Sequence, residues 1–161
     1  YLAKASAEMA TLASKPFTVL NADLTRVVRT VKLAARNSVF PIKVRMEYER
    51  KCCISGIAIC TPTKLYEVEA AHIVPVTTGG ADDIRNGIAL TQTLHWAFDR
   101  GLFSISPERR VHIPHRVKLL HENAYLNQFE GKSISEAKNV AFRAHPDAFA
   151  WHYKYCASQW E

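Results

Sequence analysis

The sequence predicts an α+β domain built around a strand, a loop, a short strand and a helix. Residues 66–74 (YEVEAAHIV) are apolar and β-branched enough to form a strand, and the proline that follows ends it. Residues 77–83 (TTGGADD) have the composition of a loop. Asn86-Gly87 is the strongest short turn signal in the chain, and it closes this loop against a short strand over 88–90.

The helix after the second strand is marked at both ends. Thr91 is a suitable N-cap, and Gly101 is placed where a helix stops. Between them, apolar residues recur at the spacing of one helical face; they are Leu94, Ala97 and Phe98. His95 and Asp99 are four residues apart, so they project from one face, one turn apart, as two ligands of one ion must.

Four residues of this stretch have the side chains that metal-assisted phosphodiester cleavage requires: His72, Asn86, His95 and Asp99. The reaction needs a base for water, an amide to hold the base, and a ligand pair for the cation. His72 lies near the end of the predicted strand, on the face opposite Ala71. Simpler interpretations exist, because Asn86 can be a turn residue and Asp99 can pair with a nearby arginine. A carboxylate near a helix C-terminus is electrostatically unfavourable, so a metal partner explains Asp99 better.

Basic residues gather before this stretch, with eight between residues 26 and 51 against two glutamates. This segment is expected to form two helices, broken near Phe40-Pro41. It is either a solvated helix face or a surface that contacts phosphates. The candidate DNA-binding residues within it are Arg26, Arg29, Arg36, Lys43 and Arg45.

After the central helix, residues 102–105 and 111–113 are expected to form a hairpin. Its turn is expected to expose two further candidate DNA contacts, Arg109 and Arg110. Two more helices complete the predicted domain, one over 121–130 before Gly131 and one after Pro146.

Several segments occur in an order that matches a known pattern. They are CCISG (52–56), EAAHIVP (69–75), NGIAL (86–90) and HWAFDRGLF (95–103), with a looser echo in PDAFAWH (146–152). In these segments the chain resembles the HNH endonucleases, in particular the restriction-type branch, over about residues 40–152. The resemblance implies an α+β fold with a ββα-metal nuclease core and flanking N-terminal and C-terminal helices.

Carried over residue by residue, the resemblance implies that His72 is the general base and that Asn86 orients it or helps at the metal. It also implies that His95 binds the ion and that Asp99 is the second helical ligand. The chain departs from many relatives at Ala71, where those relatives have a metal-binding aspartate or histidine. Glu69, on the same side of the strand, is the candidate carboxylate in its place.

The expected organisation is a helical linker over residues 1–24 and an HNH nuclease domain over 25–161. Within this domain, basic helices are expected over 25–51, the ββα-metal core over about 52–105, and a hairpin with helices over 106–161. With 161 residues and 48% hydrophobic residues, the chain is long enough for one domain with its own core. A net charge of +6 favours a polyanionic partner.

The expected function is a divalent-metal-dependent DNA endonuclease domain of a restriction or defence nuclease, using Mg²⁺ or Mn²⁺ and leaving 5′-phosphates. One alternative is a catalytically weakened DNA-binding module, because Ala71 removes a usual ligand. Another is a toxin or effector nuclease, which shares this chemistry. Nicking of plasmid DNA that depends on a metal separates the first two interpretations.

Structural zinc is not expected, because Cys52 and Cys53 are adjacent, Ser55 occupies the place of a knuckle's second cysteine, and no later cysteine pair follows. Buried thiols are the expectation instead, as in a cytoplasmic protein. No apolar stretch is long enough for a membrane span, so no membrane partner is expected. The chain does not begin with Met, which is compatible with a longer protein that carries a fused recognition or sensor domain. The sequence does not predict an oligomeric state.

Overall fold

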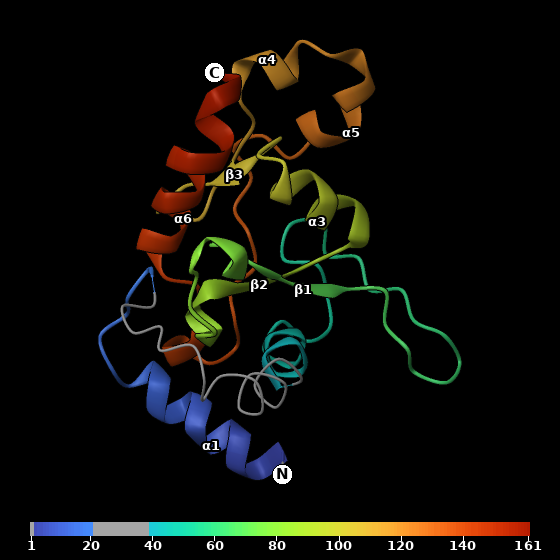
Figure 1. The fold of residues 1–161 in the computed structure, drawn as a ribbon. Helices are drawn as coiled ribbons and strands as arrows, with labels where there is room; N and C mark the ends of the chain where they lie inside the picture. The colour runs from blue at the N-terminus through green and yellow to red at the C-terminus, as the bar shows by residue number, and fades with distance from the viewer. Residues whose placement is uncertain (1, 21–38) are drawn as a thin grey trace.

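Two small antiparallel strand pairs organise the structure, a computed structural model that describes residues 2–20 and 39–161 (Figure 1). In the first pair, β1 (Glu69–His72) runs antiparallel to β2 (Gly87–Leu90). In the second, β3 (Ser104–Ile105) runs antiparallel to β4 (Val111–His112), which confirms the predicted hairpin. Helices surround both pairs, so the α+β prediction is confirmed.

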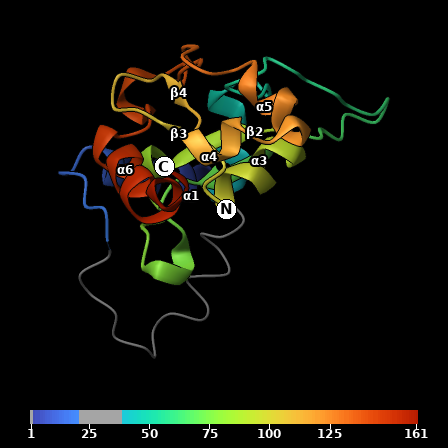
Figure 2. The ribbon, with the colours of Figure 1, turned by 90° about the horizontal axis from the view of Figure 1, so that it is seen from above.

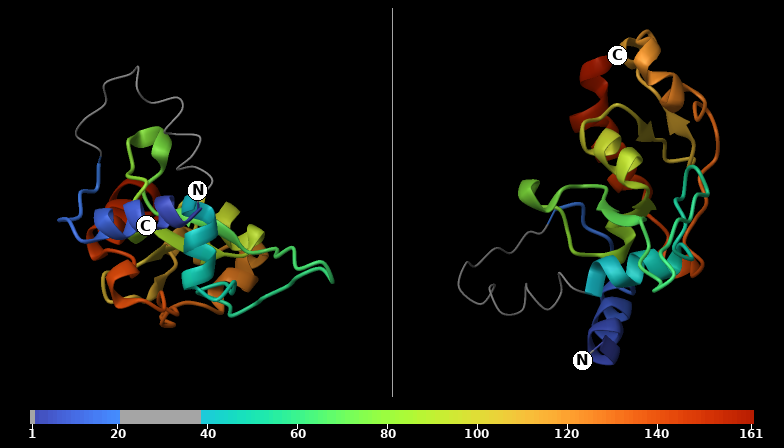
Figure 3. Two further views of the ribbon diagram at one scale, coloured as in Figure 1. Left: turned by 90° about the horizontal axis from the view of Figure 1, so that it is seen from below. Right: turned by 90° about the vertical axis from the view of Figure 1, so that its right-hand side faces the viewer.

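The helices lie on either side of these strands. They are α1 (Leu2–Ala13), a helix over 39–47, α3 (Gln92–Asp99), α4 (His115–Lys118), α5 (Ala124–Asn127) and α6 (Pro146–His152). Helix α1 lies at one end of the molecule, and the C-terminus lies with α4 and α5 at the other end (Figures 1 and 3). Seen from above, α4 lies next to the C-terminus, where the last turn of the chain (Ser158–Trp160) contacts it (Figure 2). None of the helices in the described ranges is long and apolar enough to cross a membrane.

The β1 strand is shorter than the predicted strand over 66–74. Tyr66 forms an isolated bridge with Cys60, so the first residues belong to a separate loop. Beyond His72 the Ile73 N–H still donates to the Asn86 carbonyl at 2.9 Å, but at Val74 the side chain of Asn86 takes the place of a strand partner. Local composition therefore located the strand, and tertiary hydrogen bonds shortened it.

Helix α3 has the predicted ends. The Thr91 hydroxyl accepts from the Leu94 N–H, which caps the N-terminus. Gly101 has a φ of +66°, and an added Cβ would lie 2.1 Å from the Cys156 carbonyl oxygen, so only glycine fits there. The buried face of α3 consists of the three predicted residues, Leu94, Ala97 and Phe98.

The segments outside α3 follow the prediction less closely. Phe40 and Pro41 both lie within the helix over 39–47, and the residues before 39 lie outside the described ranges, so the predicted break near this dipeptide stays a prediction. The helix predicted over 121–130 is a 3₁₀ turn over His121–Asn123 followed by the short α5, and Gly131 follows at a φ of +72°. Helix α6 begins at Pro146 as predicted, and a π turn and a 3₁₀ turn continue it to Trp160.

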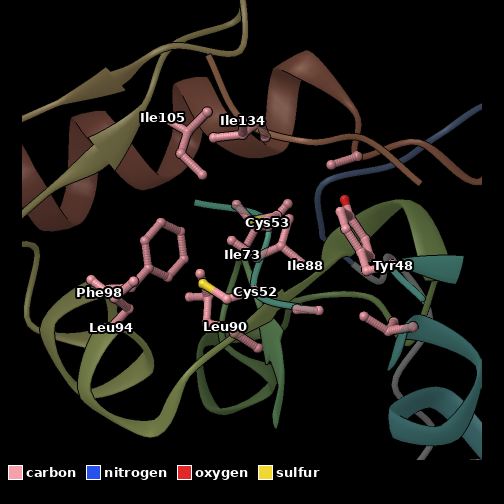
Figure 4. Packing of buried hydrophobic residues seen from close by; sticks show 14 of the residues in the cluster. Tyr48, Cys52, Cys53, Ile73, Ile88, Leu90, Leu94, Phe98, Ile105 and Ile134 are labelled. Carbon is pink, nitrogen blue, oxygen red and sulfur yellow. The ribbon is translucent and has the colours of Figure 1, made fainter. Parts of the chain in front are cut away.

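The core lies between the β1–β2 pair, α3 and the C-terminal half of the chain (Figure 4). Leu90 and Leu94 pack beside Cys52, and Phe98 extends the cluster toward Ile105 (Figure 4). This core fixes β1, β2 and α3 relative to one another, and these three elements carry the candidate site residues.

Candidate active site

The pairing of β1 with β2 divides the candidate residues between two faces. His72 is the last residue of β1 and lies opposite Gly87. Because side chains alternate along a strand, Glu69 and Ala71 lie on the other face. Helix α3 packs against both strands and reaches Glu69 through His95. The structure therefore forms two polar groups, one around His72 and one around His95.

The His72 face is covered by the helix over 39–47. The ring of Phe40 stacks on the imidazole of His72, with centroids 3.9 Å apart and 6° between the planes. A Cβ added to Gly87 would lie 2.6 Å from Val44 Cγ2 and 2.8 Å from Phe40 Cζ, so the close approach of this helix requires glycine. Phe40 is 1% exposed and therefore forms a fixed wall against one side of the His72 ring.

Asp82 holds the edge of the same imidazole. His72 Nε2 donates to Asp82 Oδ1 at 3.2 Å, and both side chains are partly buried, with 26% and 14% exposed. This bond fixes the tautomer with the proton on Nε2, which leaves the Nδ1 lone pair available as a base. The structure shows no bond to Nδ1 within the described residues.

Asn86 holds the loop between the two strands. Its side chain is fully buried, and its Oδ1 accepts from the Val74 N–H at 2.9 Å. Its Nδ2 donates to the carbonyls of Val74 and Ala81 at 3.0 and 2.9 Å. All of its strong hydrogen-bonding positions contact the backbone, so Asn86 positions the loop that carries Asp82 and does not touch the imidazole of His72.

The second group is centred on His95. Its Nδ1 donates to Glu69 Oε2 at 2.7 Å, and its Nε2 lies 3.6 Å from Asp99 Oδ2. His95 is 23% exposed, and the two carboxylates are about half exposed. The structure thus brings together all three residues that the sequence offered as metal ligands. The carboxylates, however, face opposite nitrogens of one ring.

This arrangement limits how a cation fits. Within residues 2–20 and 39–161, no group of three or more histidine, cysteine, aspartate or glutamate side chains converges on one point. Ala71 is fully buried, and its methyl group cannot replace the ligand that many relatives have. The donor chemistry of His95 Nε2 with Asp99 does suit a divalent ion, since Mg²⁺ commonly takes one or two protein ligands and fills its other positions with water and phosphate. Glu69 then matches the usual carboxylate partner of the opposite nitrogen of a ligating histidine.

The candidate DNA contacts differ in their surroundings. Arg26, Arg29 and Arg36 lie outside the described residues. Lys43 forms an ion pair with Glu47 at 3.3 Å, so its charge is already balanced. Arg45 has no ion pair within the described residues and lines a surface groove.

The expected exposure of the hairpin arginines is wrong for one of them. Arg109 is half-buried, forms an ion pair with Glu136, and donates to the Ala144 carbonyl at 3.2 Å. It therefore joins the hairpin to the C-terminal segment and is not available to a DNA backbone. Arg110 is exposed and donates to the Gly131 carbonyl at 3.0 Å.

Two residues of this site were not among the candidates of the sequence analysis, Asp82 and Phe40. Asp82 belongs to a segment whose composition indicates only a turn, although a carboxylate ten residues from the proposed base was a usable signal. Phe40 is distant in sequence, and only the packing of its helix against Gly87 brings it to His72.

Comparisons with known proteins agree with this geometry. Residues 52–106, which contain the β1–β2 pair and α3, match the family of HNH endonucleases. A solved structure described as a modification-dependent TagI restriction endonuclease has a similar fold, with a TM-score of 0.58 and 19% sequence identity. The similarity covers 82% of this chain and 40% of that chain. No curated protein matches the sequence. The strand, loop, strand and helix that carry His72 and His95 thus lie within the segment that matches the HNH endonuclease family, and this match indicates a nuclease.

Proposed function

We propose that this domain hydrolyses phosphodiester bonds of DNA with His72 as general base and a divalent cation at His95. The observation that carries the proposal is the fixed state of His72. Asp82 holds its Nε2, Phe40 stacks on its ring, and no bond to its Nδ1 is formed by the described residues. A histidine in this state can take a proton from water at Nδ1, while the carboxylate of Asp82 stabilises the imidazolium that forms.

The second polar group provides the electrostatic part of the proposal. His95 Nε2 and Asp99 would hold the cation, and Glu69 would keep the proton on Nδ1 so that Nε2 can act as a ligand. When bound, Mg²⁺ or Mn²⁺ supplies positive charge for the scissile phosphate and for the leaving 3′ oxygen. Asn86 contributes indirectly, because it fixes the loop on which Asp82 lies.

A role in restriction or another defence process is part of the same proposal. The TagI protein is described as modification-dependent, and this chain spans 40% of its length. We infer that the residues described here serve as a nuclease module and that selection of the DNA target involves surfaces beyond the His72 and His95 groups.

Nicking of supercoiled plasmid DNA in Mg²⁺ or Mn²⁺ tests the proposal. His72→Ala is expected to reduce the rate by roughly 100-fold or more, because a general base contributes about that much. His121→Ala is a matched control, since the His121 side chain is 93% exposed and belongs to neither polar group. Near wild-type nicking by His72→Ala would refute the role of this residue. DNA binding without any nicking by the wild-type chain would favour the alternative of a weakened binding module.

A further inference from the structure

A groove lies between the helix over 39–47 and a projecting loop formed by residues 57–67, here called the finger. Its volume is about 240 Å³. The finger extends away from the body of the molecule just before β1 and is visible in every ribbon view (Figures 1, 2 and 3). It lies outside both polar groups of the candidate active site.

The finger is an ordered turn. The Thr61 N–H donates to the Leu65 carbonyl at 2.8 Å, and the Lys64 N–H donates to the Thr61 carbonyl at 2.9 Å. Cys60 and Tyr66 form a bridge below this turn. Lys64 has a φ of +66°, which is a left-handed conformation typical of tight turns. Its side chain lines the groove.

Three cationic side chains line the groove: Arg45, Arg50 and Lys64. In the described part of the chain, none of the three forms an ion pair with a carboxylate, whereas nearby Lys43 does. Arg45 is held by a bond from its Nε to the Pro41 carbonyl at 3.1 Å, and the Arg50 guanidinium lies 5.2 Å from the centre of the Tyr66 ring. Three positive charges without carboxylate partners around one groove produce a positive potential that attracts a polyanion.

The remaining walls are apolar and accessible. Leu65 is 69% exposed and Met46 is 49% exposed, although side chains of this kind are usually buried. A nucleic acid strand offers phosphates to the cations and sugar and base surfaces to the apolar side chains. The wall formed by the helix over 39–47 also carries Phe40, which stacks on His72, so one helix connects the groove to the proposed base.

We propose that this groove is a secondary DNA-binding site, in which Arg50 and Lys64 contact phosphates of the substrate and the finger lies against the sugar and base surface. The proposal rests on the proposed nuclease function and adds the surface that holds the DNA beside the reacting group. It assigns a role to Lys64 and the finger, which lie outside the basic segment of the sequence, and to Arg50, which lies in that segment but is not among the candidate DNA contacts given above.

Glycine substitutions test the site without straining the fold. Arg50 and Lys64 have φ values of +57° and +66°, which glycine adopts more easily than any other residue. Binding of the full-length chain to a fluorescent duplex is measured in EDTA, so that no cleavage occurs. The double variant Arg50→Gly, Lys64→Gly is expected to raise Kd by roughly 10- to 100-fold and to reduce the log–log salt slope by about 1.8, since each lost phosphate contact removes about 0.9.

Glu49→Gly is the matched control, because Glu49 precedes Arg50 and has a similar φ of +53°. It changes the backbone in the same way but removes a negative charge, so Kd should stay the same or fall. If the wild-type protein binds and nicks DNA and the double variant has an unchanged Kd and salt slope, the role of the groove in DNA binding is refuted. The proposed function would then still stand. A wild-type chain that neither binds nor nicks DNA would overturn the proposed function itself.

Cys60 provides an independent measurement of proximity. It is exposed on the finger, whereas Cys52 and Cys53 are buried and Cys156 lies half-buried beyond α6. Duplex DNA with a tether that ends in a mixed disulfide with an aromatic thiol is expected to exchange with Cys60, releasing the aromatic thiol, much faster than with Cys156, and Cys60→Ser should abolish this product. Equal rates at Cys60 and Cys156 would contradict a finger that lies on DNA.

Discussion

Single polar residues of the site differ in how many of their hydrogen-bonding atoms remain free. Asn86 uses its amide oxygen and nitrogen on the backbone of the loop, so it has nothing left to offer a substrate. His72 uses only Nε2 and keeps Nδ1. Asp82 connects Asn86 with His72. It belongs to the loop that the Asn86 side chain holds, and its carboxylate accepts a hydrogen bond from the His72 ring. A structural role and a chemical role are therefore separable by mutation.

Asn86→Ala is expected to destabilise the fold by about 3 kcal/mol or more, because it leaves buried backbone groups of Val74 and Ala81 without partners. The measurement is urea denaturation followed by circular dichroism. Asn86→Asp should also destabilise, since a carboxylate cannot donate to the two carbonyls. A variant as stable as wild type but inactive in nicking would instead indicate direct participation of Asn86 in the reaction.

Asp82→Asn is expected to lower kcat by about 10- to 100-fold with little change in KM, because the amide removes the charge that stabilises the His72 imidazolium while the loop keeps its shape. Steady-state kinetics on plasmid DNA provide the measurement. Glu122→Gln, at a carboxylate that is 67% exposed, serves as the control. An equal loss in both variants would argue against a specific role of Asp82.

Among the elements, α3 depends most on contacts at its ends. It has eight residues, too few to be stable alone. At its N-terminus, the Glu67 carboxylate accepts from the Gln92 N–H at 2.7 Å. At its C-terminus, His152 Nε2 donates to the Phe98 carbonyl at 2.9 Å, and the same imidazole stacks on the Phe98 ring at 3.7 Å. The orientation of His95 and Asp99 thus depends on residues from other segments.

The His152 contact makes stability depend on pH. Burial lowers the pKa of His152 from its usual 6.5 to about 4, despite the opposing effect of the Phe98 carbonyl. Between these values the unfolded chain binds a proton that the folded chain excludes, so stability is complete above pH 6.5 and falls as the pH drops toward 4. The loss is on the order of 3 kcal/mol. Denaturation at several pH values should show this slope in wild type and in the exposed control His121→Gln, but not in His152→Gln.

The sequence predicted α3 well because its signals are local. A cap at Thr91, an apolar face and a stop at Gly101 can each be read within a few residues. The length of β1 could not be read in this way, because Ile73 and Val74 are as apolar as any strand residue. The ladder ends only where the side chain of Asn86, in place of a backbone partner, bonds to Val74. The helix predicted over 121–130 is divided into a 3₁₀ turn and the short α5, and its composition did not show this division.

The candidate site was predictable in its residue types and less so in its geometry. Motif spacing identified His72, Asn86, His95 and Asp99. His72 lies at the end of β1 and His95 lies one turn from Asp99 on α3, while the roles of these residues stay predictions. The spacing did not reveal that Glu69 and Asp99 would face opposite nitrogens of His95, because side-chain direction depends on the packing of α3 against β1. Nor did the motif spacing reveal that the side chain of Arg109 points toward the protein and forms an ion pair with Glu136, which lies 27 residues further along the chain.

The whole molecule contributes more to the site than the matched family segment does. Residues 52–106 leave out the helix over 39–47 and the C-terminal half of the core. The Cys53 carbonyl, for example, accepts from the Ser135 N–H at 2.7 Å, and Phe149 is fully buried. The segment that matches the family therefore depends on chain on both sides of it.

A fragment of residues 52–106 alone is expected not to fold cooperatively, because it loses buried partners and is too small to compensate. Circular dichroism during thermal unfolding should show no sigmoidal transition for the fragment, while the full chain, as the control, shows one. A cooperative transition in the fragment would mean that the ββα segment is independent of its surroundings.

The tight fit of Gly87 against Phe40 and Val44 limits which substitutions related chains can accept at these three positions. Any side chain at position 87 would collide with both residues, so a change there can survive only if positions 40 and 44 both give way at the same time. A smaller residue at 40, in turn, removes the aromatic surface against His72. Among related chains, positions 40, 44 and 87 should therefore covary. A substitution at one of them should be tolerated only when the other two have changed as well.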